Sequence, residues 1–143
     1  MTYVLGARSR ARLVGVHPNL VKVVERALAV SAIDFTVIEG LRTHERQVEL
    51  YAQGRTKPGP KVTWTMQSKH LKQADGFGHD VDVGPLLPGG GIDWQNTKGF
   101  DAISIAMFAA AEELGVRLRW GADWDRDGVT RERGETDSPH FEI

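Results

Sequence analysis

The chain has 143 residues, 41% of them hydrophobic and 26% charged, which is the composition of a single soluble globular domain. Eighteen Lys and Arg residues against nineteen Asp and Glu residues give a formal net charge of −1. This balance argues against a partner held by bulk electrostatics, such as a nucleic acid or an anionic membrane. The chain has no cysteine, so disulfides, thiolate metal sites and cysteine nucleophiles are excluded, and any metal must bind to carboxylates and to the five histidines.

The first residues carry neither the apolar core nor the small-residue cleavage site of a secretory signal. No apolar stretch approaches the ~20 residues that cross a bilayer. We therefore expect a protein that starts in the cytoplasm of the cell that makes it and does not insert into a membrane.

Apolar periodicity and capping residues predict three helices and four strands. The helices begin at Pro18, after the N-cap Thr43 and near Asp101, and the strands are 35–38, 79–83, 117–120 and 140–143. Polar, loop-like sequence fills residues 56–75. The prediction is an α+β domain in which about three helices pack on a small antiparallel sheet.

The five histidines fall into two groups. His17 precedes a helix start and His44 lies in the first turn of a polar helix, so both are expected to be capping or solvated residues. His70, His79 and His140 instead stand beside carboxylates, where loops turn into strands.

Two aspartates stand close together in one of these regions. In a strand with a side-chain period of two, Asp80 and Asp82 share a face, and a face with two carboxylates needs a cation or solvent. Two histidines and one aspartate form an open zinc site when a fourth position is left for water. An exposed polar strand explains the same residues without a metal.

Asp137 stands three residues before His140. Pro139 favours an extended backbone before it, and three extended residues span at most ~10 Å between Cα atoms. A carboxylate at Asp137 is then placed to act as a general base on water activated by a metal held at His140. A loop aspartate that caps a turn is the alternative.

Four segments resemble, in order, the motifs of the zinc D-Ala-D-Ala carboxypeptidase and L-alanyl-D-glutamate peptidase family. Residues 39–43 are similar to its Gly-x-Arg-Ser/Thr segment, and residues 68–70 with 78–82 to its Ser-x-His…Gly-x-Ala-x-Asp signature. Residues 120–124 resemble its Trp-Gly-Gly-Asp-Trp turn, and residues 137–142 its carboxylate three residues before a terminal histidine. The resemblance runs from about residue 14 to the C-terminus, and residues 35–43 look most like phage endolysins of the L-alanyl-D-glutamate type.

The resemblance implies a hedgehog/D,D-peptidase-like fold and a role for each matching residue. The implied zinc ligands are His70, Asp82 and His140. Asp137 is implied as the catalytic base, Arg42 as the group that meets a substrate carboxylate or the developing oxyanion, and Ser68 as a supporting contact.

The chain departs from the family pattern at two points. Asp82 follows His70 by twelve residues instead of the usual seven, so the 71–77 segment contains an insertion. Asp80 stands where the family has a small alanine, so Asp80 or His79 is a candidate to assist or replace a zinc ligand. His79 is the reserve ligand.

A second cation site is suggested by the acidic run that begins at Asp123. Asp123, Asp125 and Asp127, followed by Gly128, match the opening of an EF-hand calcium loop, but Gly134 occupies its twelfth position, between Glu132 and Glu135. The alternatives are a calcium site built from these five carboxylates and a solvated acidic loop.

The function expected from the resemblance is that of a zinc endopeptidase that hydrolyses the L-Ala–D-Glu bond of peptidoglycan stem peptides and lyses a phage's host. It is expected to act as a monomer with one domain over residues 1–143, without a separate wall-binding domain. It would stay in the host cytoplasm until the membrane is permeabilised. The rival functions are a D-Ala-D-Ala carboxypeptidase and a catalytically silent wall- or calcium-binding module.

Overall fold

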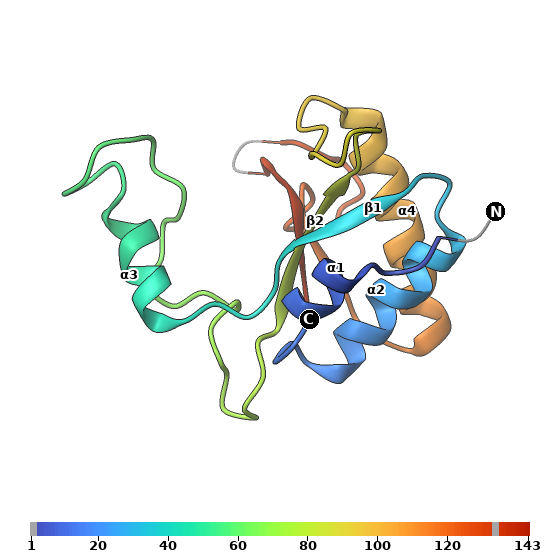
Figure 1. Ribbon diagram of the computed structural model, residues 1–143, viewed down its shortest axis with the longest axis horizontal. Helices are drawn as coiled ribbons and strands as arrows, with labels where there is room; N and C mark the ends of the chain where they lie inside the picture. Colours follow the sequence, from blue (N-terminus) through green and yellow to red (C-terminus); the bar gives the residue numbers. More distant parts are fainter. Residues whose placement is uncertain (1–2, 133–134) are drawn as a thin grey trace.

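A computed structural model describes residues 3–132 and 135–143 as four helices and a four-stranded sheet (Figure 1). The elements are α1 (Ala7–Arg12), α2 (Pro18–Val30), β1 (Phe35–Glu39), α3 (His44–Ala52), β2 (Asp80–Pro85), α4 (Thr97–Leu114), β3 (Arg119–Gly121) and β4 (Asp137–Glu142). The strand order is β1-β2-β4-β3, and every pair is antiparallel. The predicted α+β class is confirmed, with α1 as a helix that the sequence pattern did not predict.

The boundaries of several elements differ from the predicted ones, most clearly at the starts of α4 and β4. Helix α4 begins at Thr97 because Asn96 accepts a hydrogen bond from the Gly99 amide and caps the helix before its apolar stripe starts. Strand β4 begins at Asp137, three residues before the predicted start. Among the described residues, no helix is long and apolar enough to cross a membrane.

One face of the sheet forms the hydrophobic core. Val81 and Val83 of β2 are fully buried there, next to Phe141 of β4, which is opposite Val81 in the register. Helices α1, α2 and α4 lie together on the right of the sheet in Figure 1, and the apolar faces of α2 and α4 contribute most of the other side of this core. Because side chains alternate along a strand, the residues between these apolar positions must face the opposite side of the sheet.

Helix α3 and residues 53–67 after it form an arm that projects to the left of the sheet in Figure 1. The arm is fastened by Gln47, whose side chain is fully buried. Its amide nitrogen donates to Thr63 and to the Thr65 carbonyl, and its amide oxygen accepts from Arg42. These bonds hold the arm as one wall over the polar face of the sheet.

A bulge in β4 changes the direction of its first residues. Trp120 pairs with Phe141, but the next residue, Gly121, pairs with Asp137, so residues 138–140 have no partner on β3. In a regular strand, Asp137 and His140 would point to opposite faces, and the bulge removes this alternation. The approach of the two strands requires glycine at position 121, since a Cβ there would lie 2.8 Å from the Asp137 Cβ and closer still to the Asp137 carbonyl oxygen.

Candidate active site

The polar face of the sheet gathers acidic and imidazole side chains from two neighbouring strands. Asp80 and Asp82 of β2 are paired in the register with Glu142 and His140 of β4. His70 comes from the loop before β2 and is 2% exposed. His70, Asp80 and His140 are all buried and offer ligand atoms within 4.8 Å of one another, so these residues form a group able to hold a metal ion.

Asp82 lies closer to the two imidazoles than Asp80 does. Its Oδ1 lies 3.3 Å from His70 Nε2 and 3.2 Å from His140 Nδ1. Asp80 Oδ2 lies 3.8 Å from His70 Nε2 and 3.3 Å from His140 Nε2, the other nitrogen of that ring. The two aspartates therefore face different edges of His140.

The orientation of His70 is fixed by the backbone. Its Nδ1 donates to the buried Gly40 carbonyl at 2.8 Å, which leaves Nε2 directed at the aspartates. Its amide donates to Ser68 Oγ at 3.1 Å, so Ser68 stabilises the loop that carries His70. The Arg42 amide closes the arrangement by donating to the His70 carbonyl at 2.7 Å.

The orientation of His140 is fixed by Glu142. His140 Nε2 donates to Glu142 Oε1 at 3.0 Å, and Lys69 and Arg119 in turn hold Glu142 Oε2, at 3.0 and 2.6 Å. A ligating histidine commonly donates its second ring N–H to a carboxylate, which fixes the ring and its tautomer. Sequence reasoning missed Glu142, although its spacing of two from His140 in a strand places both on one face.

The carboxylates raise the affinity of both imidazoles for protons. Burial lowers the pKa of His140, but its hydrogen bonds with Asp82 and Glu142 and the charges of Asp82 and Asp80 outweigh burial and raise it to about 10. The pKa of His70 is also raised, because the hydrogen bond with Asp82 and the charges of Asp82 and Asp80 outweigh burial.

The two aspartates respond to the site in opposite ways. Burial raises the pKa of Asp80 to about 6, and its Oδ1 is buried without a hydrogen-bond partner. Burial also acts to raise the pKa of Asp82, but the hydrogen bonds from His140 and His70 prevail and lower it well below its ordinary value. Asp82 therefore stays ionised and is the carboxylate with which both imidazoles interact.

Asp137 stands beside this group at the edge of the cleft. Its Oδ2 lies 3.8 Å from His140 Nδ1, and 52% of its side chain is exposed. Loss of surrounding water in the cleft raises its pKa, with His140 and His70 opposing the shift and Asp82 adding to it. A half-exposed carboxylate with a raised pKa is suited to accepting and returning a proton.

Arg42 is held by a bidentate ion pair. Its Nε and Nη2 donate to the two carboxylate oxygens of Glu39 at 2.8 Å each, and its Nη1 donates to Gln47 at 2.7 Å. These bonds use three of the five guanidinium N–H groups and leave one on each terminal nitrogen. Arg42 is thus fixed in position, with two donors left for a ligand in the cleft.

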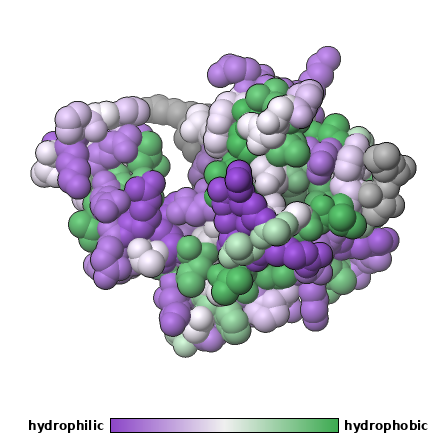
Figure 2. All heavy atoms as spheres, viewed as in Figure 1, coloured by the Kyte–Doolittle hydropathy of each residue, from purple (hydrophilic) through white to green (hydrophobic). Residues whose placement is uncertain are grey.

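These residues line a cleft of about 420 Å³ between the sheet and the arm. A notch separates the arm from the body of the molecule in Figure 2. The lining comprises Arg42, Val62, Thr63, Thr65, Gln67, Ser68, Lys69, His70, Asp80, Asp82, Arg119, Trp124, Asp137, His140 and Glu142. The structure thus brings together all the principal site residues suggested by the sequence: His70, Asp82, His140, Asp137, Arg42 and Ser68.

His79, the reserve ligand, lies outside this cleft. Its Nε2 is 2.7 Å from Asp75 Oδ2, and it takes no part in the group around His70 and His140. Asp80, which precedes the strand's first apolar residue, is the additional carboxylate that faces both imidazoles.

The acidic loop after β3 gathers its carboxylates. Asp123, Asp125 and Asp127 offer oxygens within 4.8 Å of one another, and Asp125, Glu132 and Glu135 form a second such group. Glu135 is 4% exposed, and its Oε1 is buried without a hydrogen-bond partner. Gly134, at the twelfth position of the expected calcium loop, lies outside the described residues.

Two known proteins are similar to this chain in sequence. The chain is 34% identical over 146 residues to the L-alanyl-D-glutamate peptidase of Escherichia phage T5, covering 100% of this chain and 99% of that protein. It is 33% identical over 124 residues to the peptidoglycan L-alanyl-D-glutamate endopeptidase CwlK of Bacillus subtilis (strain 168), covering 82% of this chain and 65% of that protein.

A solved structure shares the fold. The crystal structure of the Serratia marcescens L-Ala D-Glu endopeptidase ChiX is similar with a TM-score of 0.76 and 34% sequence identity, covering 99% of this chain and 90% of that one. The family model described as phage L-alanyl-D-glutamate peptidase matches residues 1–143. The chain therefore belongs to the phage L-alanyl-D-glutamate peptidase family.

Proposed function

We propose that this protein is a zinc-dependent endopeptidase that hydrolyses the L-Ala–D-Glu bond of peptidoglycan stem peptides and thereby lyses a phage's host. The observation that carries the proposal is the meeting of two oriented imidazoles, Asp82 and the half-exposed Asp137 in one cleft. The names of the phage T5, Bacillus and Serratia relatives support the choice of substrate and bond.

His70 Nε2, Asp82 Oδ1 and His140 Nδ1 are the proposed zinc ligands. The Asp82 oxygen lies 3.3 and 3.2 Å from the two nitrogens, close to the roughly 3.3 Å between neighbouring ligands of a tetrahedral zinc ion with bonds of ~2.0–2.1 Å. The second nitrogens already donate to the Gly40 carbonyl and to Glu142, as ligating histidines require. Zinc bound there supplies a Lewis acid that polarises the scissile carbonyl and makes water a nucleophile near neutral pH.

Asp80 is proposed as a supporting carboxylate instead of a ligand. The His140 nitrogen that it faces is the one already committed to Glu142. Asp80 Oδ1 is buried without a hydrogen-bond partner. The negative charge of Asp80 next to the proposed ligands favours the binding of a divalent cation.

Asp137 and Arg42 are proposed to carry out the remaining steps. Asp137 takes a proton from the attacking water and returns it to the leaving amine, a task for which its raised pKa suits it. Arg42, immobilised by Glu39, directs its two remaining N–H groups at a stem-peptide carboxylate or at the developing oxyanion. The enzyme is proposed to act as a monomer that reaches the wall from the host cytoplasm after membrane permeabilisation.

The bond that is cleaved can be identified from the products. Purified peptidoglycan digested with the zinc-loaded protein should release the stem peptide at its L-Ala, and mass spectrometry of the muropeptides would detect this product. Loss of a single terminal alanine would instead identify a D-Ala-D-Ala carboxypeptidase. Muropeptides that remain intact would indicate a catalytically silent wall- or calcium-binding module.

Replacing Asp137 tests its role as the base. Asp137→Asn keeps the shape of the side chain but removes its proton-accepting charge, so kcat should fall about 10²–10⁴-fold while bound zinc is retained. Asp101→Asn is a matched control, because Asp101 is also about half exposed but lies outside the cleft. Undiminished wall lysis by Asp137→Asn would show that another group is the base.

Zinc binding should release protons in mildly alkaline solution. The raised pKa of His140, about 10, keeps this imidazole charged in the metal-free protein at pH 8, whereas an ordinary histidine is neutral there. Because zinc requires neutral imidazoles, its affinity should rise with pH up to about 10, and acid should release the metal. Calorimetry at pH 8 in buffers of different ionisation enthalpy should show release of about one proton or more per zinc, and a heat independent of the buffer would refute this.

We also propose that calcium binds the loop carrying Asp123, Asp125 and Asp127, with Glu132 and Glu135 completing the site. Hydrogen bonding with Asp127, burial and the neighbouring negative charges raise the pKa of Glu132 to about 7, a crowding that a divalent cation would relieve. Calcium at ~100 times its Kd should raise the thermal midpoint by roughly 5–10 °C, and Asp127→Asn should reduce this shift. A thermal midpoint that does not change with calcium would indicate that these residues form a solvated acidic loop without a calcium site.

A further inference from the structure

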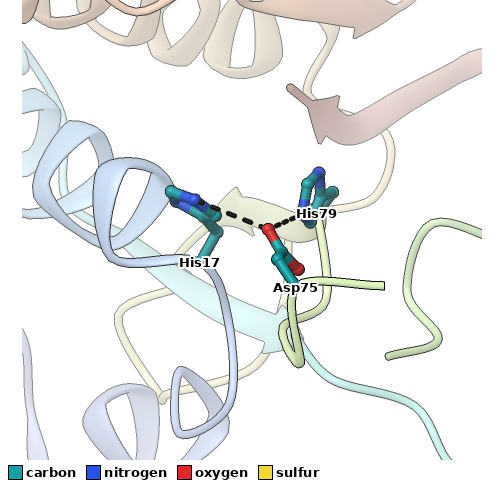
Figure 3. A group of neighbouring side chains, drawn as sticks. All are labelled: His17, Asp75 and His79. Carbon is teal, nitrogen blue, oxygen red and sulfur yellow. Dashed lines mark hydrogen bonds and ion pairs between the residues drawn. The ribbon is translucent and has the colours of Figure 1, made fainter. Parts of the chain in front are cut away.

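A second group of histidines and an aspartate lies outside the cleft. His17 caps the N-terminus of α2, Asp75 lies in the 71–77 loop, and His79 immediately precedes β2 (Figure 3). The three residues offer ligand atoms within 4.8 Å of one another. Figure 3 shows both imidazoles directed at the carboxylate between them. Between 24% and 41% of each side chain is exposed, so solvent ions can reach the group.

The backbone fixes the positions of the two histidines. The His17 amide donates to the Gly78 carbonyl, and the Gly78 amide donates to the Gly15 carbonyl, each at 2.9 Å. The His79 amide donates to the Lys69 carbonyl at 2.7 Å. These bonds tie the start of α2 to the start of β2, so the spacing of the two imidazoles is set by the fold.

The loop presents one carboxylate oxygen to both rings. The Phe77 amide donates to Asp75 Oδ1 at 3.1 Å, which fixes the carboxylate group. Oδ2 is then 2.7 Å from His79 Nε2 and 3.7 Å from His17 Nε2. The Phe77 ring packs edge-on against His17, with the centroids 5.6 Å apart, and covers one side of the group.

We propose that His17, Asp75 and His79 bind a second divalent transition-metal ion of the zinc class. Two imidazoles and one carboxylate favour zinc and its neighbours over calcium or magnesium, which prefer oxygen ligands alone. The donor spacings of 2.7 and 3.7 Å lie on either side of the roughly 3.3 Å between zinc ligands, so small side-chain rotations suffice. An ion here fastens the 71–77 loop to α2 without entering the cleft.

Binding at His17 has a structural signature. His17 Nδ1 accepts the Asn19 amide at 3.1 Å, so the proton of the neutral ring is on Nε2. An ion at Nε2 moves this proton to Nδ1, which can then no longer accept a hydrogen bond. Zinc should therefore change the environment of the Asn19 amide, an atom that is itself no ligand.

Zinc titration of the chelator-treated full chain tests the proposal. His17→Asn retains an N-cap acceptor and Asp75→Asn retains the hydrogen bond from Phe77, so both variants should fold, and each should bind one zinc ion fewer than the wild type. His44→Asn, which removes a histidine outside both groups, is the control and should bind the wild-type number of ions. The Asn19 amide resonance should shift with zinc in the wild type and in His70→Ala.

Unchanged zinc stoichiometry in both His17→Asn and Asp75→Asn would overturn the second site. The result does not depend on the catalytic proposal, because it is a difference of one ion between variants. If the cleft held no zinc, the wild type would bind one ion and His17→Asn none.

Discussion

The site depends on carboxylates placed where water is scarce. Alternation along β2 gives Val81 and Val83 to the core and Asp80 and Asp82 to the opposite face, where His140 of β4 meets them. Buried negative charge is costly unless cations accompany it. The Gly40 carbonyl and Glu142 fix the orientations of the two imidazoles. When protonated, the imidazoles neutralise the buried carboxylates, and when they lose that proton they can bind a metal ion.

The geometry of the cleft also depends on an irregularity in the sheet. A regular β4 would turn Asp137 away from His140, and the bulge at residues 138–140 brings both to the same side. Gly121 permits the close approach that holds the bulge, while Trp120 stacks on Phe141 and donates to the Ser138 carbonyl. The Trp-Gly segment therefore supports the position of Asp137, the proposed base.

Local patterns predicted most of the fold, because apolar periodicity, Pro18 and the Thr43 cap directly determine α2 and α3. The six-residue α1 escaped prediction since it buries little apolar surface of its own, and its only buried residue is Ser9. The motifs predicted residues that the structure gathers in one cleft, but the orientation of the His140 ring depends on Glu142, which Lys69 and Arg119 hold. The contacts of Lys69 and Arg119 with Glu142 join residues far apart in the chain and leave no periodic signal in the sequence.

The twelve-residue step from His70 to Asp82 leaves the cleft intact because the loop is closed at its base. The hydrogen bond from the His79 amide to the Lys69 carbonyl joins the residue before β2 to the residue before His70. None of residues 71–79, between these points, lines the cleft. This loop instead places Asp75 against His17 and His79, where the second metal ion is proposed to bind, outside the cleft.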